Sequence, residues 1–198
     1  MSYLAYANGM DEQNRLVTEP RSGNPTAAPG RTPEQVVAHF LDAFGRHDLE
    51  AISRLCADDI VELLPGTPPL EGIDNEVAFI SGLLAAFPDM EIDVTRLMAI
   101  DHVVAAAWTR RGTFTGADFQ GLPANGARVE SPAAGFFEIE DGLIKKLTAY
   151  ADMNKFGRDL GLVPPEGSPA ERLALGMFRA RVRIKRIVGA LTGGKGVN

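Results

Sequence analysis

The sequence predicts an α+β fold in which helices come first and a curved antiparallel sheet follows. Up to Pro88 the apolar residues recur mainly at helical spacing, whereas after Pro88 they alternate as they do in strands. Four strand-like segments then succeed one another with only turns between them. Such a run is typical of an antiparallel meander and excludes a parallel βαβ arrangement.

Composition divides the 198 residues into three parts. Residues 1–30 are rich in Gly, Pro, Asn, Ser and Thr and have no periodicity, which indicates a flexible N-terminal arm. Residues 31–165 carry the regular hydrophobic pattern and are expected to form the domain. Residues 166–198 are expected to form a basic amphipathic helix and a tail.

Three helices are expected before Pro88. Thr32 can cap the first, Pro33 suits its first position and Gln35 can complete a capping box. Asp48 can cap a short second helix, and Asp74 is expected to cap the third. The buried face predicted for the first helix comprises Val36, Val37, Phe40, Leu41 and Phe44.

One strand is expected among the helices and four after them. The early strand is "DDIVELL", which the turn-rich "PGTPPLEG" ends. The later ones are "MEIDVTRLMAI", "HVVAAAWTRRGTFTG", "ARVESPAAGFFEIE" and "LIKKLTAYADM". Asp141-Gly142, before the last strand, is a strong hairpin signal.

The expected C-terminal helix, from Ser168 to about Leu191, differs in charge from the rest of the chain. From Ser168 onward there are seven Lys or Arg residues and one acid, a net charge of +6, whereas the preceding residues carry −12. One apolar stripe comprises Leu173, Met177, Ala180, Ile184, Ile187, Val188 and Leu191. The favoured interpretation is that this stripe covers the domain or a dimer mate. The alternatives are contact with an anionic membrane surface or with an acidic partner.

Several function classes lack support in the sequence. A net charge of −6 argues against nucleic-acid binding. His39, His47 and His102 lie in different elements without ligand spacing, so no metal site is expected. No glycine-rich phosphate loop occurs, so no cofactor is expected. Cys56 is the only cysteine, and neither a membrane span nor a secretory signal is recognisable, which favours a cytoplasmic protein.

Several stretches are similar to one family. "AAFPDMEIDV", "WTRRGTFTGADFQGLPANGARVE" and "FFEIEDGLIKKLTAYADMNKFGRDLGLVP" together resemble the SnoaL-like polyketide cyclases, within the NTF2-like and ketosteroid-isomerase-like superfamily. The resemblance covers about residues 32–165. It implies a cone-shaped fold, a homodimer formed through the open face of the sheet, and a hydrophobic small-molecule substrate. It also implies ring closure by intramolecular aldol condensation, with an acid/base carboxylate on the last strand.

By motif position that carboxylate is Asp152, and period-two spacing puts Thr148, Tyr150 and Asp152 on one face of the strand. An apolar cone would raise the pKa of such a carboxyl toward neutrality, as a general base requires. The expected catalytic residues are Asp152, Tyr150 and Arg110, and the expected substrate-binding residues are Trp108, Phe114, Phe137 and Glu62. Simpler alternatives stay open: Asp152 as a cap of the segment that follows, and Arg110 or Glu62 as surface residues.

Two other functions are weighed against cyclisation or isomerisation. The limonene-epoxide-hydrolase branch of the superfamily uses an Asp-Arg-Asp triad, of which Arg110 and Asp152 would match two members. The position of the other aspartate holds Gly112, so this function ranks lower. The remaining alternative is a non-catalytic ligand-binding or interaction module.

Overall fold

The computed structural model describes residues 30–192, with side chains as far as residue 184. The chain divides into two compact units, one ending at Leu160 and the other beginning at Gly161. The flexible arm expected for residues 1–30 lies outside the described residues except for Gly30.

The first unit begins with helices α1 (Pro33–Gly45) and α2 (Leu49–Leu55), and α3 (Ile73–Ala86) follows the first two strands. The capping box is confirmed, because Thr32 Oγ1 accepts from the Gln35 amide and the Gln35 side chain accepts from the Thr32 amide. Asp48 caps α2, as predicted, by accepting from the Ala51 amide at 2.8 Å.

The prediction that Asp74 caps α3 is wrong. The cap position belongs to Gly72, which makes no side-chain hydrogen bond, and Asp74 lies in the first turn. Gly72 has φ = 85°, a left-handed conformation that glycine adopts without steric cost. The chain can therefore turn from β2 directly into α3 one residue after the strand ends.

Six strands form one sheet: β1 (Cys56–Leu63), β2 (Leu70–Glu71), β3 (Glu91–Ile100), β4 (Val103–Thr113), β5 (Arg128–Glu140) and β6 (Leu143–Ala151). Their order is β2-β1-β6-β5-β4-β3. The predicted antiparallel meander from β3 to β6 is confirmed. The sheet is nevertheless mixed, because β1 pairs with β6 in parallel.

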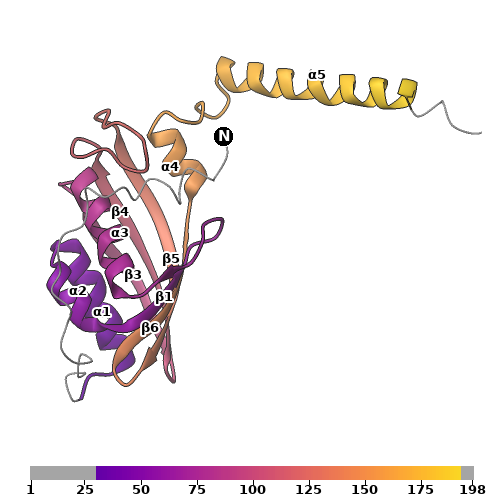
Figure 1. Ribbon diagram of the computed structural model, residues 1–198. Helices are drawn as coiled ribbons and strands as arrows, with labels where there is room; N and C mark the ends of the chain where they lie inside the picture. Colours follow the sequence, from indigo (N-terminus) through magenta and orange to yellow (C-terminus); the bar gives the residue numbers. More distant parts are fainter. Residues whose placement is uncertain (1–29, 193–198) are drawn as a thin grey trace, which may run out of the picture. The chain divides into compact units, whose positions relative to one another are not determined.

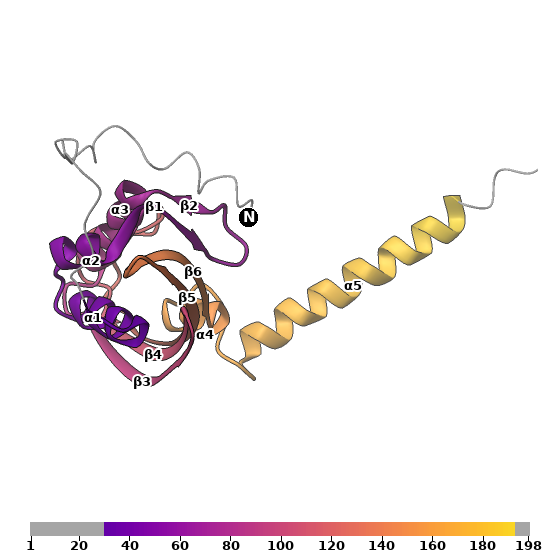
Figure 2. The same cartoon turned by 90° about the horizontal axis from the view of Figure 1, so that it is seen from below.

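The sheet is curved and unclosed, and α1, α2 and α3 lie on one side of it (Figures 1 and 2). Irregular register at Thr95 in β3, and at Lys145 in β6 opposite Glu138 and Ile139 of β5, marks bulges of the kind that bend strands. The core between helices and sheet includes Phe40 and Phe137, whose ring centroids are 5.8 Å apart.

Two further helices complete the described chain. Helix α4 (Met153–Asp159) follows β6 in the first unit, and α5 (Pro169–Thr192) belongs to the second. The second unit is described by itself. Within residues 30–192, no helix is long and apolar enough to cross a membrane.

Candidate active site

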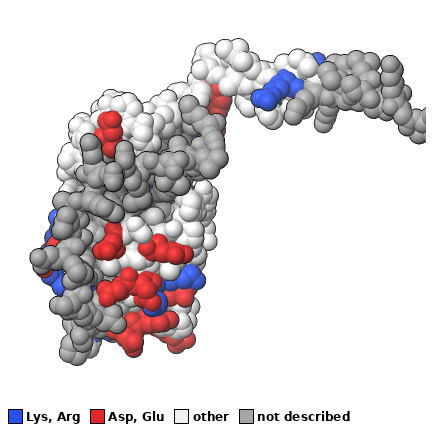
Figure 3. Space-filling model, viewed as in Figure 1, with Lys and Arg blue, Asp and Glu red and all other residues white. Residues whose placement is uncertain are grey.

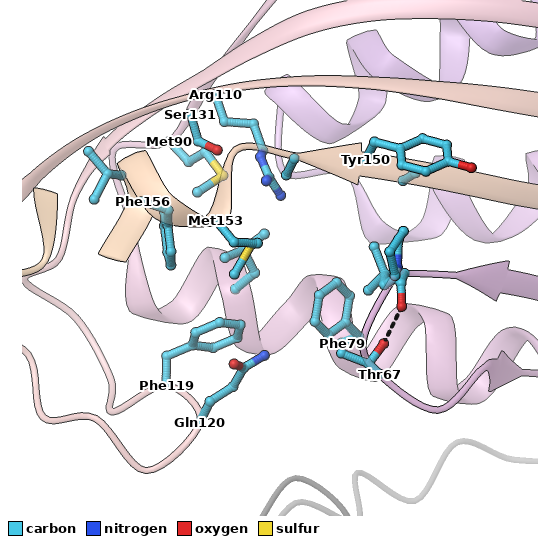
Figure 4. Close-up of a pocket in the computed structure, with 16 residues that line it drawn as sticks. Thr67, Phe79, Met90, Arg110, Phe119, Gln120, Ser131, Tyr150, Met153 and Phe156 are labelled. Atoms are coloured by element: carbon cyan, nitrogen blue, oxygen red, sulfur yellow. Dashed lines mark hydrogen bonds between the residues drawn. The ribbon is translucent and has the colours of Figure 1, made fainter. Parts of the chain in front are cut away.

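A cavity of about 260 Å³, here called the outer chamber, lies between the sheet, α3 and α4 (Figure 4). Its wall is mostly apolar and includes rings from α3, α4 and the loop between β4 and β5. The lining residues are Leu64, Pro65, Thr67, Phe79, Leu83, Met90, Arg110, Phe119, Gln120, Val129, Ser131, Ala149, Tyr150, Ala151, Met153 and Phe156.

An inner chamber of about 50 Å³ shares Arg110, Leu83 and Ala149 with the outer one, so the two adjoin. Its wall adds Phe40, Leu41 and Phe44 of α1 and two carboxyl side chains. The space exists in part because three of the side chains that β5 and β6 supply here are small: Ala133, Ala149 and Ala151.

The two carboxyl groups are those of Glu62 on β1 and Glu76 on α3. Their exposed fractions are only 6% and 1%, and the two groups are hydrogen-bonded to each other. Glu62 is inward-facing because it alternates with Val61 and Leu63, which are half-buried. Glu76 is inward-facing because it lies one turn from Ile73 and Ile80, both on the buried side of α3.

The pair carries unusual proton affinities. Burial, followed by the charge of Glu62 and the hydrogen bond to it, raises the pKa of Glu76 to about 9. Burial also raises the pKa of Glu62, although the hydrogen bond from Glu76 and the charge of Arg110 oppose that rise. Near neutral pH the pair therefore retains a proton. The hydrogen bond between the two groups raises the pKa of Glu76 and lowers that of Glu62, which is the direction that Glu76 as the donor produces.

Three hydrogen-bonding side chains come from β4 and β5. Trp108 and Arg110 face the cavity from β4, and Ser131 lies directly opposite Arg110 on β5. Among the described residues, Trp108 Nε1, Ser131 Oγ and the second oxygen of Glu76 are buried without a hydrogen-bond partner. Unpaired buried polar groups cost free energy, so a ligand with hydrogen-bonding oxygens would relieve this cost.

Asp152 does not lie where the motif comparison puts it. It is exposed, forms the N-cap of α4, and accepts from the Lys155 amide at 2.8 Å. The inward-facing residues of β6 are Leu147, Ala149 and Ala151, so the predicted pocket position of Asp152 is wrong by one residue of strand phase. The alternative that it is a cap is confirmed.

Tyr150 is on the wall of both chambers, but its side chain is half exposed and its hydroxyl points away from Arg110 (Figure 4). This orientation does not favour the expected role of Tyr150 as a donor beside Arg110. Arg110 itself faces inward, as predicted, whereas its neighbour Arg111 is exposed and pairs with Asp93 at 3.3 Å.

The expected aromatic surface is found in part. Trp108 and Phe137 line the inner chamber, and Glu62 lies beside them in its wall. Phe114 does not line either chamber. It is 1% exposed and stacks on Phe87 with ring centroids 5.0 Å apart, so it is a core residue.

Two residues of this site were missed by the sequence analysis: Glu76 and Ser131. Glu76 had a recognisable signal, because it is an acid at a helical position that its spacing from Ile73 and Ile80 assigns to the apolar face. Ser131 had only the alternation of β5 to mark it. Across the described residues no three His, Cys, Asp or Glu side chains gather as a metal site would need.

Comparison with known proteins adds the following. A family model described as a SnoaL-like domain matches residues 37–147, more than half of the chain. Among solved structures, IdmH from Streptomyces antibioticus, a proposed polyketide cyclase, is 27% identical with a TM-score of 0.59. That match covers 66% of this chain and 99% of IdmH. A comparison with curated proteins found no match.

Two more distant structures show the same fold. A proposed SnoaL-like polyketide cyclase from Jannaschia sp. CCS1 is 19% identical with a TM-score of 0.61, over 70% of this chain and 100% of that one. An LEH-like epoxide hydrolase from M. tuberculosis is 20% identical with a TM-score of 0.54, over 65% of this chain and 88% of that one.

Proposed function

Because this chain belongs to the SnoaL-like domain family, we propose that it is a cofactor-independent cyclase or isomerase that acts on a hydrophobic, polyketide-like carbonyl compound. The observation that carries the proposal is the buried pair Glu62–Glu76 at the inner end of an apolar cavity. In this proposal the pair replaces Asp152 as the acid/base group.

The first step is removal of a proton from a carbon next to a carbonyl group. The carboxylate of Glu62 takes the proton, the electron pair of the C–H bond forms a C=C bond, and the π pair of the carbonyl group moves onto its oxygen to give an enolate. Trp108 Nε1–H and the Arg110 guanidinium are the donors that stabilise this oxygen, since both face the cavity.

The second step distinguishes the two reactions. In ring closure the enolate carbon attacks a second carbonyl carbon of the same molecule, and the alkoxide that forms takes the proton of Glu76. In isomerisation Glu62 returns its proton to a different carbon. After ring closure Glu62 holds a proton and Glu76 does not, and transfer through their hydrogen bond restores the starting state.

The apolar wall supports a substrate with a ring or chain body and few charges. Phe79, Phe119 and Phe156 surround the outer chamber, and rings of this kind suit flat, hydrophobic molecules. Ser131 Oγ, opposite Arg110, offers a hydrogen bond to a further oxygen of the substrate.

The test is proton exchange with a bicyclic ketone, 2-tetralone, in D₂O, followed by mass spectrometry. We expect the protein to accelerate deuterium uptake next to the carbonyl and Glu62→Gln to reduce that acceleration by about 100-fold or more. Asp152→Asn is the matched control and should exchange at the wild-type rate. Fast exchange by Glu62→Gln together with slow exchange by Asp152→Asn would contradict the proposal.

Epoxide opening is the second candidate, because a neutral acid (Glu76), a carboxylate (Glu62) and an arginine lie at the same cavity. Glu76 would protonate the epoxide oxygen while Glu62 takes a proton from the attacking water. The products separate the two functions: ring closure and isomerisation conserve the substrate's mass, whereas epoxide opening adds one water.

We also propose a homodimer that pairs through the outer face of the sheet. Met98, Ile100 and Phe136 are exposed on this face, with exposed fractions of 61%, 77% and 51%. The register supports one continuous patch, since Met98 is opposite Ala105 and Ala105 is opposite Phe136. Exposed apolar patches of this kind mark interaction surfaces.

A further inference from the structure

Helix α5 has an apolar stripe that no other described element of its own unit covers. Among residues 161–192 it is the only helix or strand, so this described part of the second unit offers no second element to pack against it. Leu173, Met177 and Ile184 recur four and seven residues apart and therefore share one side of the helix. The sequence continues this spacing with Ile187 and Leu191.

Basic residues border the stripe on both sides. Each residue of an α-helix lies about 100° around the axis from the one before it. Arg181 therefore falls on one side of the line through Met177 and Ile184, and Arg183 falls on the other. No Asp or Glu follows Glu171 in the sequence, so neither border carries an opposing charge.

We propose that α5 lies on the surface of an anionic lipid bilayer and so holds the protein at a membrane. An interfacial helix buries its apolar stripe at the boundary between headgroups and acyl chains, and its flanking Lys and Arg side chains reach the lipid phosphates. Anionic lipid attracts such bases further. The helix would lie on the bilayer rather than cross it, in keeping with the absence of a spanning helix in residues 30–192.

An acidic protein surface is the competing occupant. Acidic side chains gather over the lower part of the first unit in the face shown in Figure 3. A bilayer fits α5 better, because a helix embedded at the membrane surface has lipid headgroups on both sides of its apolar stripe, where Arg181 and Arg183 lie.

A shorter apolar strip lies on the opposite side of α5. It comprises Leu175, Phe178 and Val182.

The experiment is co-sedimentation of the full chain with lipid vesicles. One set is phosphatidylcholine, and the other is phosphatidylcholine with phosphatidylglycerol in a three-to-one ratio. We expect binding to the anionic vesicles that is about ten-fold or more tighter than to the neutral ones. The preference should shrink in about 1 M salt, where the Debye length is about 3 Å. Equal binding to both sets, or binding to neither, would overturn the proposal.

A matched pair of variants tests the stripe itself. Ile184→Glu and Val182→Glu change the charge equally and lie two residues apart, on different sides of α5. We expect Ile184→Glu to weaken vesicle binding about ten-fold or more, because it removes a buried apolar side chain as well as adding a charge. Val182→Glu should weaken vesicle binding only a few-fold, because it adds the same negative charge without removing a side chain of the stripe.

An equal loss of vesicle binding in both variants would mean that charge alone attracts α5 to the vesicles. That result would overturn the proposal that the apolar stripe inserts into the bilayer. If Ile184→Glu leaves vesicle binding unchanged but alters the molecular mass in solution or the melting temperature, the stripe packs on protein. That outcome also overturns the proposal. Circular dichroism of both variants checks that α5 remains helical.

Discussion

The carboxyl groups of Glu62 on β1 and Glu76 on α3 are hydrogen-bonded to each other at the inner end of the cavity. Two acids placed together away from water cannot both ionise at low cost, so one of them keeps its proton at neutral pH. A single site thus holds both a base and an acid, which is what reversible proton transfer to a carbonyl compound requires.

Stability should fall as the pH rises because of Glu76. Its pKa is about 9 in the folded protein against an ordinary value of 4.5, so between these values the folded state holds a proton that the unfolded chain releases. This contribution is complete below pH 4.5 and is lost as the pH passes 9. We expect the melting temperature to fall by roughly 5 °C or more across this window.

Glu76→Gln is the variant that checks the assignment, because glutamine keeps the shape but does not titrate. Its melting temperature should depend on pH much less than that of the wild type, and the two should diverge most in alkali. Carboxylates whose pKa is lowered in the folded protein, such as Asp89, change their charge only at acid pH, so they do not alter stability between pH 4.5 and 9. An unchanged pH dependence in Glu76→Gln would show that another group is responsible.

The rate of ring closure should also decline in alkali. Above pH 9 Glu76 loses its proton, so the site no longer holds the acid that ring closure needs. We expect the pH–rate profile of the wild type to have an alkaline limb near this value. In Glu76→Gln the limb should disappear, and ring closure should be slower by about 100-fold. A limb that persists in the variant would assign it to a different residue.

Asp152 should matter for stability and not for chemistry. Replacing an N-cap by alanine costs about 1 kcal/mol, whereas asparagine at a cap performs nearly as well as aspartate. Asp152→Ala should therefore lower the free energy of unfolding by about 1 kcal/mol, and Asp152→Asn should change it little. Urea denaturation measures both. A large loss of exchange rate in Asp152→Asn would return this residue to the site.

Gly116 should tolerate no side chain. A Cβ atom at this position would lie 1.9 Å from the carbonyl oxygen of Ala85, so the loop between β4 and β5 would have to move away from α3. Gly116→Ala should cost about 1–3 kcal/mol and weaken ligand binding, since the loop carries Phe119 and Gln120. Gly82→Ala is the control, because its Cβ would meet the Phe119 ring at an ordinary 3.9 Å.

The proposed dimer depends on the outer face of the sheet. Phe136→Lys puts a charge in the middle of that face, and we expect it to convert a dimer into a monomer. Light scattering after size-exclusion chromatography measures the mass. Ala78→Lys, an exposed position on α3, is the matched control and should leave the mass unchanged. A wild-type protein that is already monomeric would contradict the proposed dimer.

Local signals in the sequence were enough to predict most of the helices and strands, although the short strand β2 (Leu70–Glu71) lies in a segment expected to be a turn. The capping box at Thr32, the change of period after Pro88 and the Asp141-Gly142 turn act over a few residues, and each is confirmed where the structure tests it. The cap at Asp74 failed because Gly72 provides a backbone conformation that no hydrogen-bonding side chain announces.

The site depended on relations that no local pattern contains. The face of Asp152 is decided by how β6 pairs with β5 and β1, and a shift of one residue reverses it. Period-two spacing correctly put Trp108 and Arg110 on one face of β4, and the structure shows that this face is the one toward the cavity.

By itself, the sequence determined most of the helices and strands, their order, and the family to which the chain belongs, because these follow from spacing, caps and motifs along the chain. Only the tertiary structure decided that a strand residue, Glu62, meets a helix residue, Glu76, out of contact with water. Burial and mutual proximity set the proton affinity of such a pair, and both are properties of the folded packing alone.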